Sequence, residues 1–182
     1  MSQPTPDVEP AGRRPPIVTV RPVRVDDAEG VVLVLNPIIE ARTYTALDTP
    51  FSVNAERDFI RRFPARGIFH VATAEPDGRI VGFQNVEPFA TYTHAFDHVG
   101  VIGTYVDLTR RRQGIASQLF DATVAAAPGC GFEKLFAFVR ADNLPALFTY
   151  LHHGFRAIGN ARRQARIDGR YVDEIMIERL LP

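Results

Sequence analysis

A run of cationic and small residues stands where an apolar segment ends and a helix-forming segment begins. It comprises Arg110, Arg111, Arg112, Gln113, Gly114, Ile115, Ala116 and Ser117. The first N–H groups of a helix lack partners within it and lie at the positive end of its dipole, so they can bind a diphosphate if small side chains let it approach. Gly114 and Ala116 meet that requirement, and the arginines add positive charge. The run therefore predicts a phosphate-binding turn. The alternative is a loop of solvated arginines in which Gly114 only eases a turn.

A second block, further along the chain, makes this interpretation more specific. It consists of Asn143, Ala146, Tyr150, Gly154 and Phe155. The block and the pattern Arg111-x-x-Gly114-x-Ala116 together resemble the GNAT N-acetyltransferase superfamily, and most nearly its phosphinothricin and amino-acid-type members. The resemblance extends from Ile17 to Leu181, and two blocks at the expected separation are far more specific than one.

The resemblance implies an enzyme that moves an acetyl group from acetyl-CoA to an amine by direct attack, without a metal ion. The pantetheine arm would lie between two parted strands and hydrogen-bond the main chain of one, as an added strand would. An N–H near Val106 would stabilise the oxyanion that forms on the thioester, and Asn143 would anchor the pantetheine. The cofactor-binding residues implied in this way are Thr104, Tyr105, Val106, Arg111, Arg112, Gln113, Gly114, Ile115, Ala116, Ser117 and Asn143.

Tyr150 is the residue that the resemblance implies for proton transfer to the leaving thiolate. A free thiol has a pKa near 8.5, so a neighbouring phenol can share or donate a proton as the thiolate leaves. Without the second block, Tyr150 reads as a core aromatic residue one helical turn after Ala146. The matching Asn143 and Gly154 favour the catalytic interpretation.

The proton acceptor for the amine is less clearly marked. Members that acetylate protein N-termini carry a glutamate where this chain has Phe138, and phosphinothricin-type members carry one where it has Val101. Two other carboxylates are candidates for the catalytic base, Glu40 near the end of the first helical region and Glu87 near the end of a predicted strand. Each has the alternative of a solvent-facing acid.

The leading functional hypothesis is a small-molecule amine acetyltransferase, with an amino acid or a similar compound as acceptor. A second hypothesis is acetylation of a protein N-terminus or lysine, although Phe138 counts against the N-terminal version. The third is a non-catalytic acyl-CoA-binding regulatory module that kept the fold. The intact Asn143 and Tyr150 argue against the third.

These residues must be positioned by helices and strands, and the order of the predicted elements indicates an α/β (α+β) fold. We expect a mixed, mostly antiparallel sheet of about six to seven strands flanked by helices. Asp77-Gly78 and Asp168-Gly169 predict two hairpins. A helix opened by Asp26 and Asp27 should end at Asn36-Pro37, because the residue before a proline is pushed out of the helical region. The other predicted helices are 54–63, capped by Asn54, 115–127 and 143–151; the predicted strands are 17–21, 69–74, 80–86, 98–107, 135–139 and 172–180.

Composition limits the partners. Lys+Arg and Asp+Glu are both 21 in 182 residues, so the chain has no basic excess for nucleic acid or an anionic membrane. Cys130 is the one cysteine, which excludes an internal disulfide and favours the cytoplasm. We expect a disordered proline-rich tail over 1–16 and a single acetyltransferase domain over 17–182. A homodimer is left open, because the family often pairs through its C-terminal strands.

Overall fold

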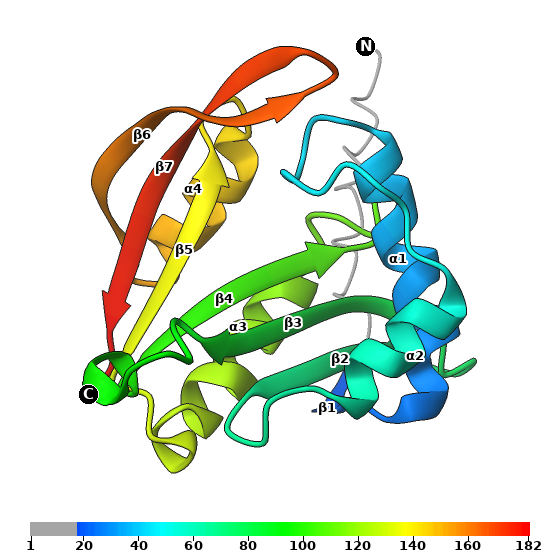
Figure 1. The fold of residues 1–182 in the computed structure, drawn as a ribbon. Coiled ribbons are helices and arrows are strands. Elements are labelled where there is room, and N and C mark those ends of the chain that lie inside the picture. The colour runs from blue at the N-terminus through cyan, green and yellow to red at the C-terminus, as the bar shows by residue number, and fades with distance from the viewer. Residues whose placement is uncertain (1–17) are drawn as a thin grey trace, which may run out of the picture.

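The computed structural model describes residues 18–182, so the predicted tail over 1–16 lies outside the described residues. The strands are β1 (Val18–Pro22), β2 (Ile68–Ala74), β3 (Ile80–Pro88), β4 (Val99–Val106), β5 (Lys134–Arg140), β6 (Arg156–Ile167) and β7 (Arg170–Leu180). The helices are α1 (Ala28–Glu40), α2 (Val53–Arg61), α3 (Ile115–Ala126) and α4 (Leu144–His152), and short 3₁₀ turns lie at Val25–Asp27, His94–Phe96 and Pro128–Cys130. Figure 1 shows how they are arranged.

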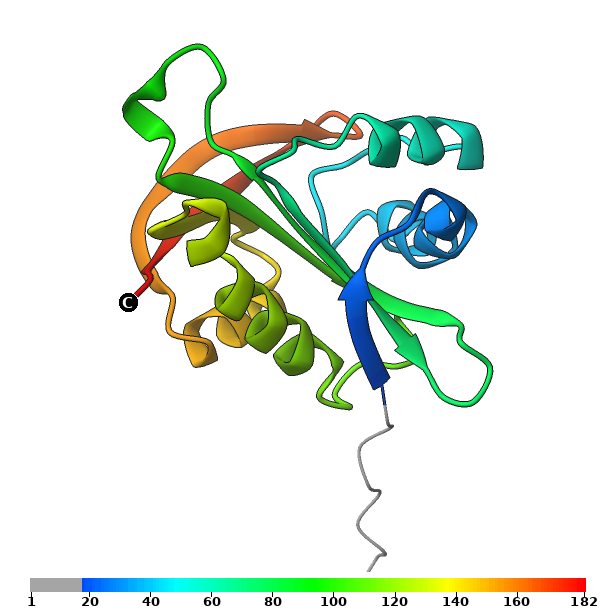
Figure 2. The ribbon, with the colours of Figure 1, turned by 90° about the horizontal axis from the view of Figure 1, so that it is seen from below.

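One mixed sheet separates two pairs of helices. Its strand order is β1-β2-β3-β4-β5-β7-β6, and β4–β5 is its parallel pair. Helices α1 and α2 cover one face and α3 and α4 cover the other (Figure 2). Apolar side chains of α1, α2 and β2–β4 form the core on the first face, and those of α3, α4 and β5 form a core on the second. The predicted mixed and mostly antiparallel sheet is confirmed.

Strands β4 and β5 part soon after they meet. Their register pairs Val99 with Lys134, Gly100 with Leu135 and Val101 with Phe136, and no further. Both strands then run on and diverge, to Val106 and Arg140, leaving the V-shaped gap seen in Figure 1. At the closed end Gly100 leaves room for the Val86 side chain of β3, since a Cβ there would lie 2.4 Å from Val86 Cγ1. The gap that the sequence predicted between two strands is therefore present.

Both predicted hairpins form. Gly78 and Gly169 take positive φ values of 67° and 77°, the left-handed conformation that these turns require of glycine. The first turn joins β2 to β3 and the second joins β6 to β7.

Two local predictions are wrong. Helix α1 continues through Pro37 to Glu40 instead of ending at Asn36. Proline removes the hydrogen bond to the carbonyl four residues back. That carbonyl belongs to Leu33, a residue that is 60% exposed, so water can replace the bond. Burial of Ile38 and Ile39 stabilises the additional turn. In α2 the cap is Ser52, whose Oγ accepts a hydrogen bond from the Ala55 N–H at 3.1 Å, and Asn54 lies inside the helix.

Candidate active site

The predicted phosphate-binding turn has an open, preformed main chain. Gly114 is the N-cap of α3 with φ 78°, and a Cβ at this position would meet no atom within 4 Å. The amides of Ile115, Ala116 and Ser117 have no acceptor within the helix, because the first N–H groups of any helix lack one. The Ile115 side chain is 1% exposed and packs into the core below. The turn is thus anchored from beneath while its amides stay accessible to a diphosphate.

Neighbouring side chains hold this turn in place. Asp107 accepts hydrogen bonds from the N–H and Oγ1 of Thr109 at 2.8 and 2.7 Å and pairs with Arg79 at 3.2 Å. Arg111 does not point into the turn; its guanidinium lies 3.9 Å from the ring centroid of Tyr44. Arg112 is exposed and Gln113 is half-buried, so the Arg112 side chain is the more accessible of the two to an anion.

The main chain of β4 presents alternate residues to the gap. The Asp107 N–H donates to the Val81 carbonyl, which fixes the phase of the antiparallel β3–β4 ladder. Hydrogen-bonded and non-hydrogen-bonded pairs alternate in such a ladder, so Tyr105 bonds β3 while the amides and carbonyls of Thr104 and Val106 face the other side. Of the three strand residues predicted to bind the pantetheine, Thr104 and Val106 therefore offer main-chain groups to the gap.

Tyr150 of α4 lies against this strand. Tyr150 is 7% exposed, and its hydroxyl donates a hydrogen bond to Thr104 Oγ1 at 3.0 Å. The same Oγ1 accepts a second hydrogen bond from Gln84 Nε2 at 2.8 Å. Its ring packs edge-on against Phe120 and Phe155, with centroid distances of 5.2 and 5.1 Å. Burial raises the pKa of the phenol well above its ordinary value. Tyr150 is therefore a neutral acid at physiological pH, beside the part of β4 that borders the gap.

Asn143 has a structural role that the sequence analysis did not assign. Its Oδ1 accepts from the Ala146 N–H at 3.3 Å and so caps α4, while its Nδ2 donates to the Tyr44 carbonyl at 3.0 Å. The same loop after α1 accepts hydrogen bonds from the buried Arg140, at 2.7 Å to the Arg42 carbonyl and 3.2 Å to that of Thr45. Asn143 and Arg140 together fasten the loop after α1 to the far side of the gap.

Replacing Asn143 with alanine should lower the free energy of unfolding by about 1–2 kcal/mol, since the cap and the bond to Tyr44 are both lost. Urea unfolding followed by circular dichroism measures this. Ser52→Ala, which removes only the cap of α2, is the matched control and should cost about 1 kcal/mol or less. An Asn143→Ala protein as stable as the wild type would contradict the role in holding α4.

The two predicted carboxylates lie in different environments. Glu40 is the exposed last residue of α1 and makes no hydrogen bond or ion pair with the residues from 18 to 182. Glu87 is half-buried on β3 opposite Val101 of β4, where it accepts a hydrogen bond from Asn85 Nδ2 at 3.3 Å. Burial raises the pKa of Glu87. The structure thus brings Glu87 to the gap, and it does not join Glu40 to this group.

One buried acidic residue was missed by the sequence analysis. Glu56 of α2 is 3% exposed and shares the inner face of its helix with Ile60. Burial raises its pKa to about 7. The signal was present in the sequence, because an acid four residues before a buried isoleucine occupies an apolar position of an amphipathic helix.

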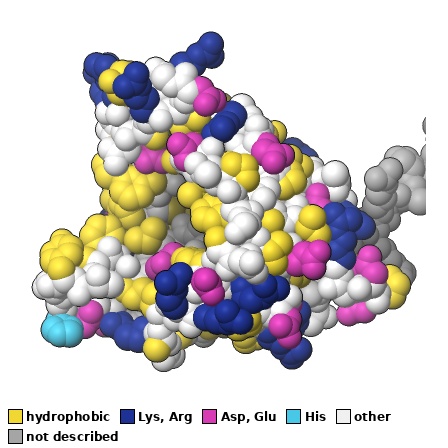
Figure 3. All heavy atoms as spheres, turned by 45° about the vertical axis from the view of Figure 1, so that its right-hand side comes forward, with side chains coloured by type: hydrophobic (Ala, Val, Ile, Leu, Met, Phe, Trp, Pro, Cys, Tyr) yellow, Lys and Arg dark blue, Asp and Glu magenta, His cyan; other side chains and the backbone are white. Residues whose placement is uncertain are grey.

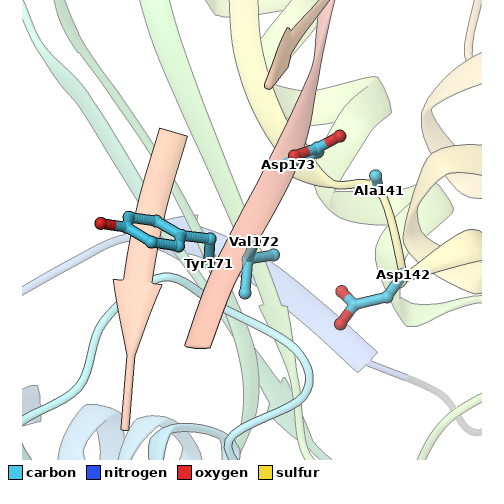
Figure 4. A pocket seen from close by; sticks show the side chains of 5 residues that line it. All are labelled: Ala141, Asp142, Tyr171, Val172 and Asp173. Atoms are coloured by element: carbon cyan, nitrogen blue, oxygen red, sulfur yellow. The ribbon is translucent and has the colours of Figure 1, made fainter. Parts of the chain in front are cut away.

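A recess lined by hydrophobic side chains separates the two halves of the molecule in Figure 3. A pocket of about 370 Å³ lies between the end of β5 and the start of β7, lined by Ala141, Asp142, Tyr171, Val172 and Asp173 (Figure 4). Both of its carboxylates are engaged, Asp142 by Arg140 at 2.7 Å and Asp173 by the Arg163 N–H at 2.6 Å. This pocket therefore contains none of the predicted catalytic groups.

The profile described as the Acetyltransferase (GNAT) family matches residues 38–155. The chain belongs to this family. It is 27% identical over 156 residues to a protein of Bacillus subtilis (strain 168) that carries the provisional name phosphinothricin acetyltransferase YwnH, with 86% of this chain and 94% of that protein covered. A crystal structure provisionally described as a phosphinothricin N-acetyltransferase is 26% identical, with a TM-score of 0.82, covering 91% of this chain and 99% of the other.

The fold is shared more widely. A phosphinothricin acetyltransferase from Sinorhizobium meliloti in complex with acetyl-CoA has a TM-score of 0.82 at 18% identity, covering 90% of this chain and 88% of the other. This GNAT chain is an acetyl-CoA-dependent N-acetyltransferase, with acetyl-CoA as its co-substrate. Over residues 18–182, no helix is long and apolar enough to cross a bilayer, and no group of three or more His, Cys, Asp or Glu side chains could hold a metal ion.

Proposed function

We propose that this acetyltransferase acetylates the primary amine of a small molecule by direct attack on acetyl-CoA. The observation that carries the proposal is the arrangement about β4 where it leaves β5. Thr104 contacts Tyr150 on the α3–α4 face, while Tyr105 packs with the α1–α2 core. Neighbouring residues of a strand point to opposite faces, so a thioester in the gap has the Tyr150 acid on one side, and the amine would approach from the other.

Each part of the site has a task in this reaction. The amides at the start of α3 and the Arg112 guanidinium bind the diphosphate, and the main chain of Thr104 and Val106 holds the pantetheine, assisted by Asn143. The Val106 N–H donates to the thioester oxygen, which becomes negative in the transition state. Of the predicted bases, Glu87 is better supported than Glu40, since Glu87 is half-buried beside the gap and Glu40 is exposed.

The reaction forms one bond and breaks one. The amine nitrogen forms a C–N bond to the acetyl carbon, and the electron pair of the carbonyl π bond moves to oxygen. When that pair returns, the C–S bond breaks and the sulfur takes a proton from Tyr150. Tyr150 recovers a proton from the acetylated nitrogen, which must lose one to become a neutral amide.

Two observations support a small acceptor. The loop after α1 is fastened across one end of the gap by Arg140 and Asn143, which narrows the space for a polypeptide. Phe138, 43% exposed on β5, stands where members that act on protein N-termini carry a glutamate. The relative at 27% identity, whose name refers to phosphinothricin, supports an amino-acid-like acceptor.

Thiol release tests the proposal. The protein is incubated with acetyl-CoA and single amines, including phosphinothricin, proteinogenic amino acids, an aliphatic diamine and a peptide with a free N-terminus, and free CoA is titrated. We expect turnover with at least one small amine and none with the peptide. Turnover with the peptide alone would favour protein acetylation. Binding of acetyl-CoA without turnover on any amine would favour a non-catalytic acyl-CoA-binding module.

A further inference from the structure

The buried acid of α2 has no structural partner. Glu56 is 3% exposed, yet its carboxylate forms no hydrogen bond and no ion pair within residues 18–182. An ionised carboxylate without partners is costly to bury, and an apolar residue beside Ile60 would stabilise the helix better. The buried carboxylate of Glu56 lowers the stability of the fold and has no contact that compensates for this cost. Such a group is a candidate for a functional role.

Glu56 lies on the face of the sheet that α1 and α2 cover, together with other oxygen atoms. It shares the inner face of α2 with Ile60, and Ile60 packs in the same core as Phe83 of β3 and Tyr105 of β4. Asn85 and Glu87 follow Phe83 on that face of β3, because alternate residues of a strand point to the same side. Burial raises the pKa of Tyr105, and the charges of Glu87 and Glu56 raise it further, against a hydrogen bond with Thr45 that lowers it. Asn85, next to Glu87 on that face of β3, has a buried Oδ1 without a hydrogen-bond partner in the described part of the chain. Opposite Asn85, Gly103 keeps this space open, since a Cβ would lie 2.8 Å from Asn85 Oδ1 and 3.1 Å from the Tyr105 ring.

The surroundings of Glu56 are acidic. Helix α1 and strands β3 and β4 contain no lysine or arginine. The cations of α2 are turned to their own helix, Arg57 to Asn54 at 2.7 Å and Arg61 to Asp58 at 3.2 Å. The titratable groups on the neighbouring elements are Asp26, Asp27, Glu29, Glu40, Glu87 and Tyr105, of which Asp27 is paired with Arg21 at 2.7 Å. Arg111 borders the same core, because its guanidinium is stacked on Tyr44. The helices and strands of this face otherwise offer hydrogen-bond acceptors and negative charge, which suits a cationic ligand.

We propose that Glu56, Glu87 and Asn85 Oδ1 receive the acceptor as its ammonium ion, and that Glu56 takes one ammonium proton before the free amine attacks. This inference rests on the proposed amine acetylation. The N–H bond breaks, its electron pair stays on nitrogen as the nucleophile, and Glu56 becomes a neutral carboxylic acid that later releases the proton to water. Glu87, already bonded to Asn85, orients the ammonium.

Burial makes Glu56 a suitable base. Its pKa of about 7 leaves it half ionised near neutral pH. An alkylammonium has a pKa near 10, so its proton transfer to Glu56 is unfavourable by about three orders of magnitude, against nearly six for an ordinary glutamate. The burial that costs stability therefore makes the proton transfer feasible.

The test compares Glu56→Gln with the wild type, using the amine found in the thiol-release panel. We expect kcat to fall at least about tenfold at pH 7.5, with an unchanged Kd for acetyl-CoA. The wild-type rate should rise with pH and level off above pH 7, whereas the Glu56→Gln rate should keep rising towards the pKa of the amine. Asp58→Asn, an exposed change on the same helix, is the matched control and should leave the rate and its pH profile unchanged.

A measurement without substrate shows whether the variant is folded and whether Glu56 titrates as stated. The folded-state pKa of Glu56 lies above its unfolded value of 4.5, so its contribution to stability is complete below pH 4.5 and is lost as the pH rises through about 7. The Tm of Glu56→Gln should therefore exceed that of the wild type by about 5–10 °C at pH 8 and hardly at all at pH 4.

The outcomes separate the two proposals. If the wild type acetylates an amine and Glu56→Gln does so with the same kcat and pH profile, Glu56 is not the proton acceptor, while amine acetylation stands. If the wild type acetylates no amine, both proposals fail. Glu56→Asp, which keeps the carboxylate, should retain a pH profile that levels off; a profile like that of Glu56→Gln would also contradict the assignment.

Discussion

Replacing Gly114 with aspartate should weaken acetyl-CoA binding about 100-fold. The new carboxylate would stand at the N-cap of α3, beside the amides proposed to hold the diphosphate. Two charges about 4 Å apart near a protein surface repel by about 4 kcal/mol before screening by salt, and about 2.7 kcal/mol corresponds to a 100-fold change in Kd. Aspartate tolerates the positive φ of 78° better than most residues, so the fold should survive. Isothermal titration calorimetry with acetyl-CoA measures the effect.

Gly78→Asp is the matched control. Gly78 also has a positive φ, 67°, and open space around its Cβ position, but it lies in the β2–β3 turn. The Gly78→Asp substitution introduces the same charge with the same backbone strain, and it should leave the Kd for acetyl-CoA unchanged. If the two aspartate variants bind acetyl-CoA equally well, the diphosphate does not lie on the α3 amides, and the proposed orientation of the thioester in the gap is wrong.

Replacing Tyr150 with phenylalanine should lower kcat about 100-fold to 1000-fold while leaving the Kd for acetyl-CoA within about twofold. The phenol is the acid proposed for the departing thiolate, and phenylalanine keeps the ring packing against Phe120 and Phe155. Thr104 keeps its hydrogen bond from Gln84, so little stability is lost. Single-turnover kinetics, which separate chemistry from product release, measure the effect.

Tyr92→Phe controls for the loss of a hydroxyl group. Tyr92 is 83% exposed in the loop between β3 and β4 and should give wild-type kinetics. A Tyr150→Phe enzyme with the wild-type kcat would remove Tyr150 from the mechanism and leave it as a core aromatic residue. A loss confined to acetyl-CoA binding would instead assign Tyr150 to cofactor packing.

Features governed by short-range interactions could be predicted from the sequence. The Asp-Gly turns form as expected because glycine alone takes their backbone conformation without strain. The turn before α3 also follows from local rules, since an unpaired set of amides arises at any helix start. Asn143, Ala146 and Tyr150 are held in relative position by one helix, so their spacing was informative before any tertiary contact was known.

Pro37 and Asn54 show where local rules fail. A proline inside a helix costs about 3 kcal/mol, and burial of Ile38 and Ile39 offsets it. Asn54 is not the cap because Ser52, an equally good capping residue, precedes it by two positions. The positions of the carboxylates also depended on tertiary structure. Glu40 and Glu87 were equivalent candidates in the sequence, and the fold leaves the first in solvent and brings the second to the gap.

Glu56 shows what could not be predicted from the sequence, namely the environment of a buried acid. The amphipathic pattern of α2 places it on the inner face, but its neighbours Glu87 and Tyr105 come from strands far along the chain. The cost of burying its charge depends on which groups surround it, and helix packing on the sheet decides that. Residue types and spacing were thus enough for the family, the cofactor and the position of the turn before α3, because those signals are local; that this turn binds the diphosphate stays a prediction. The environment of each acid, and with it the assignment of the base, came from long-range packing.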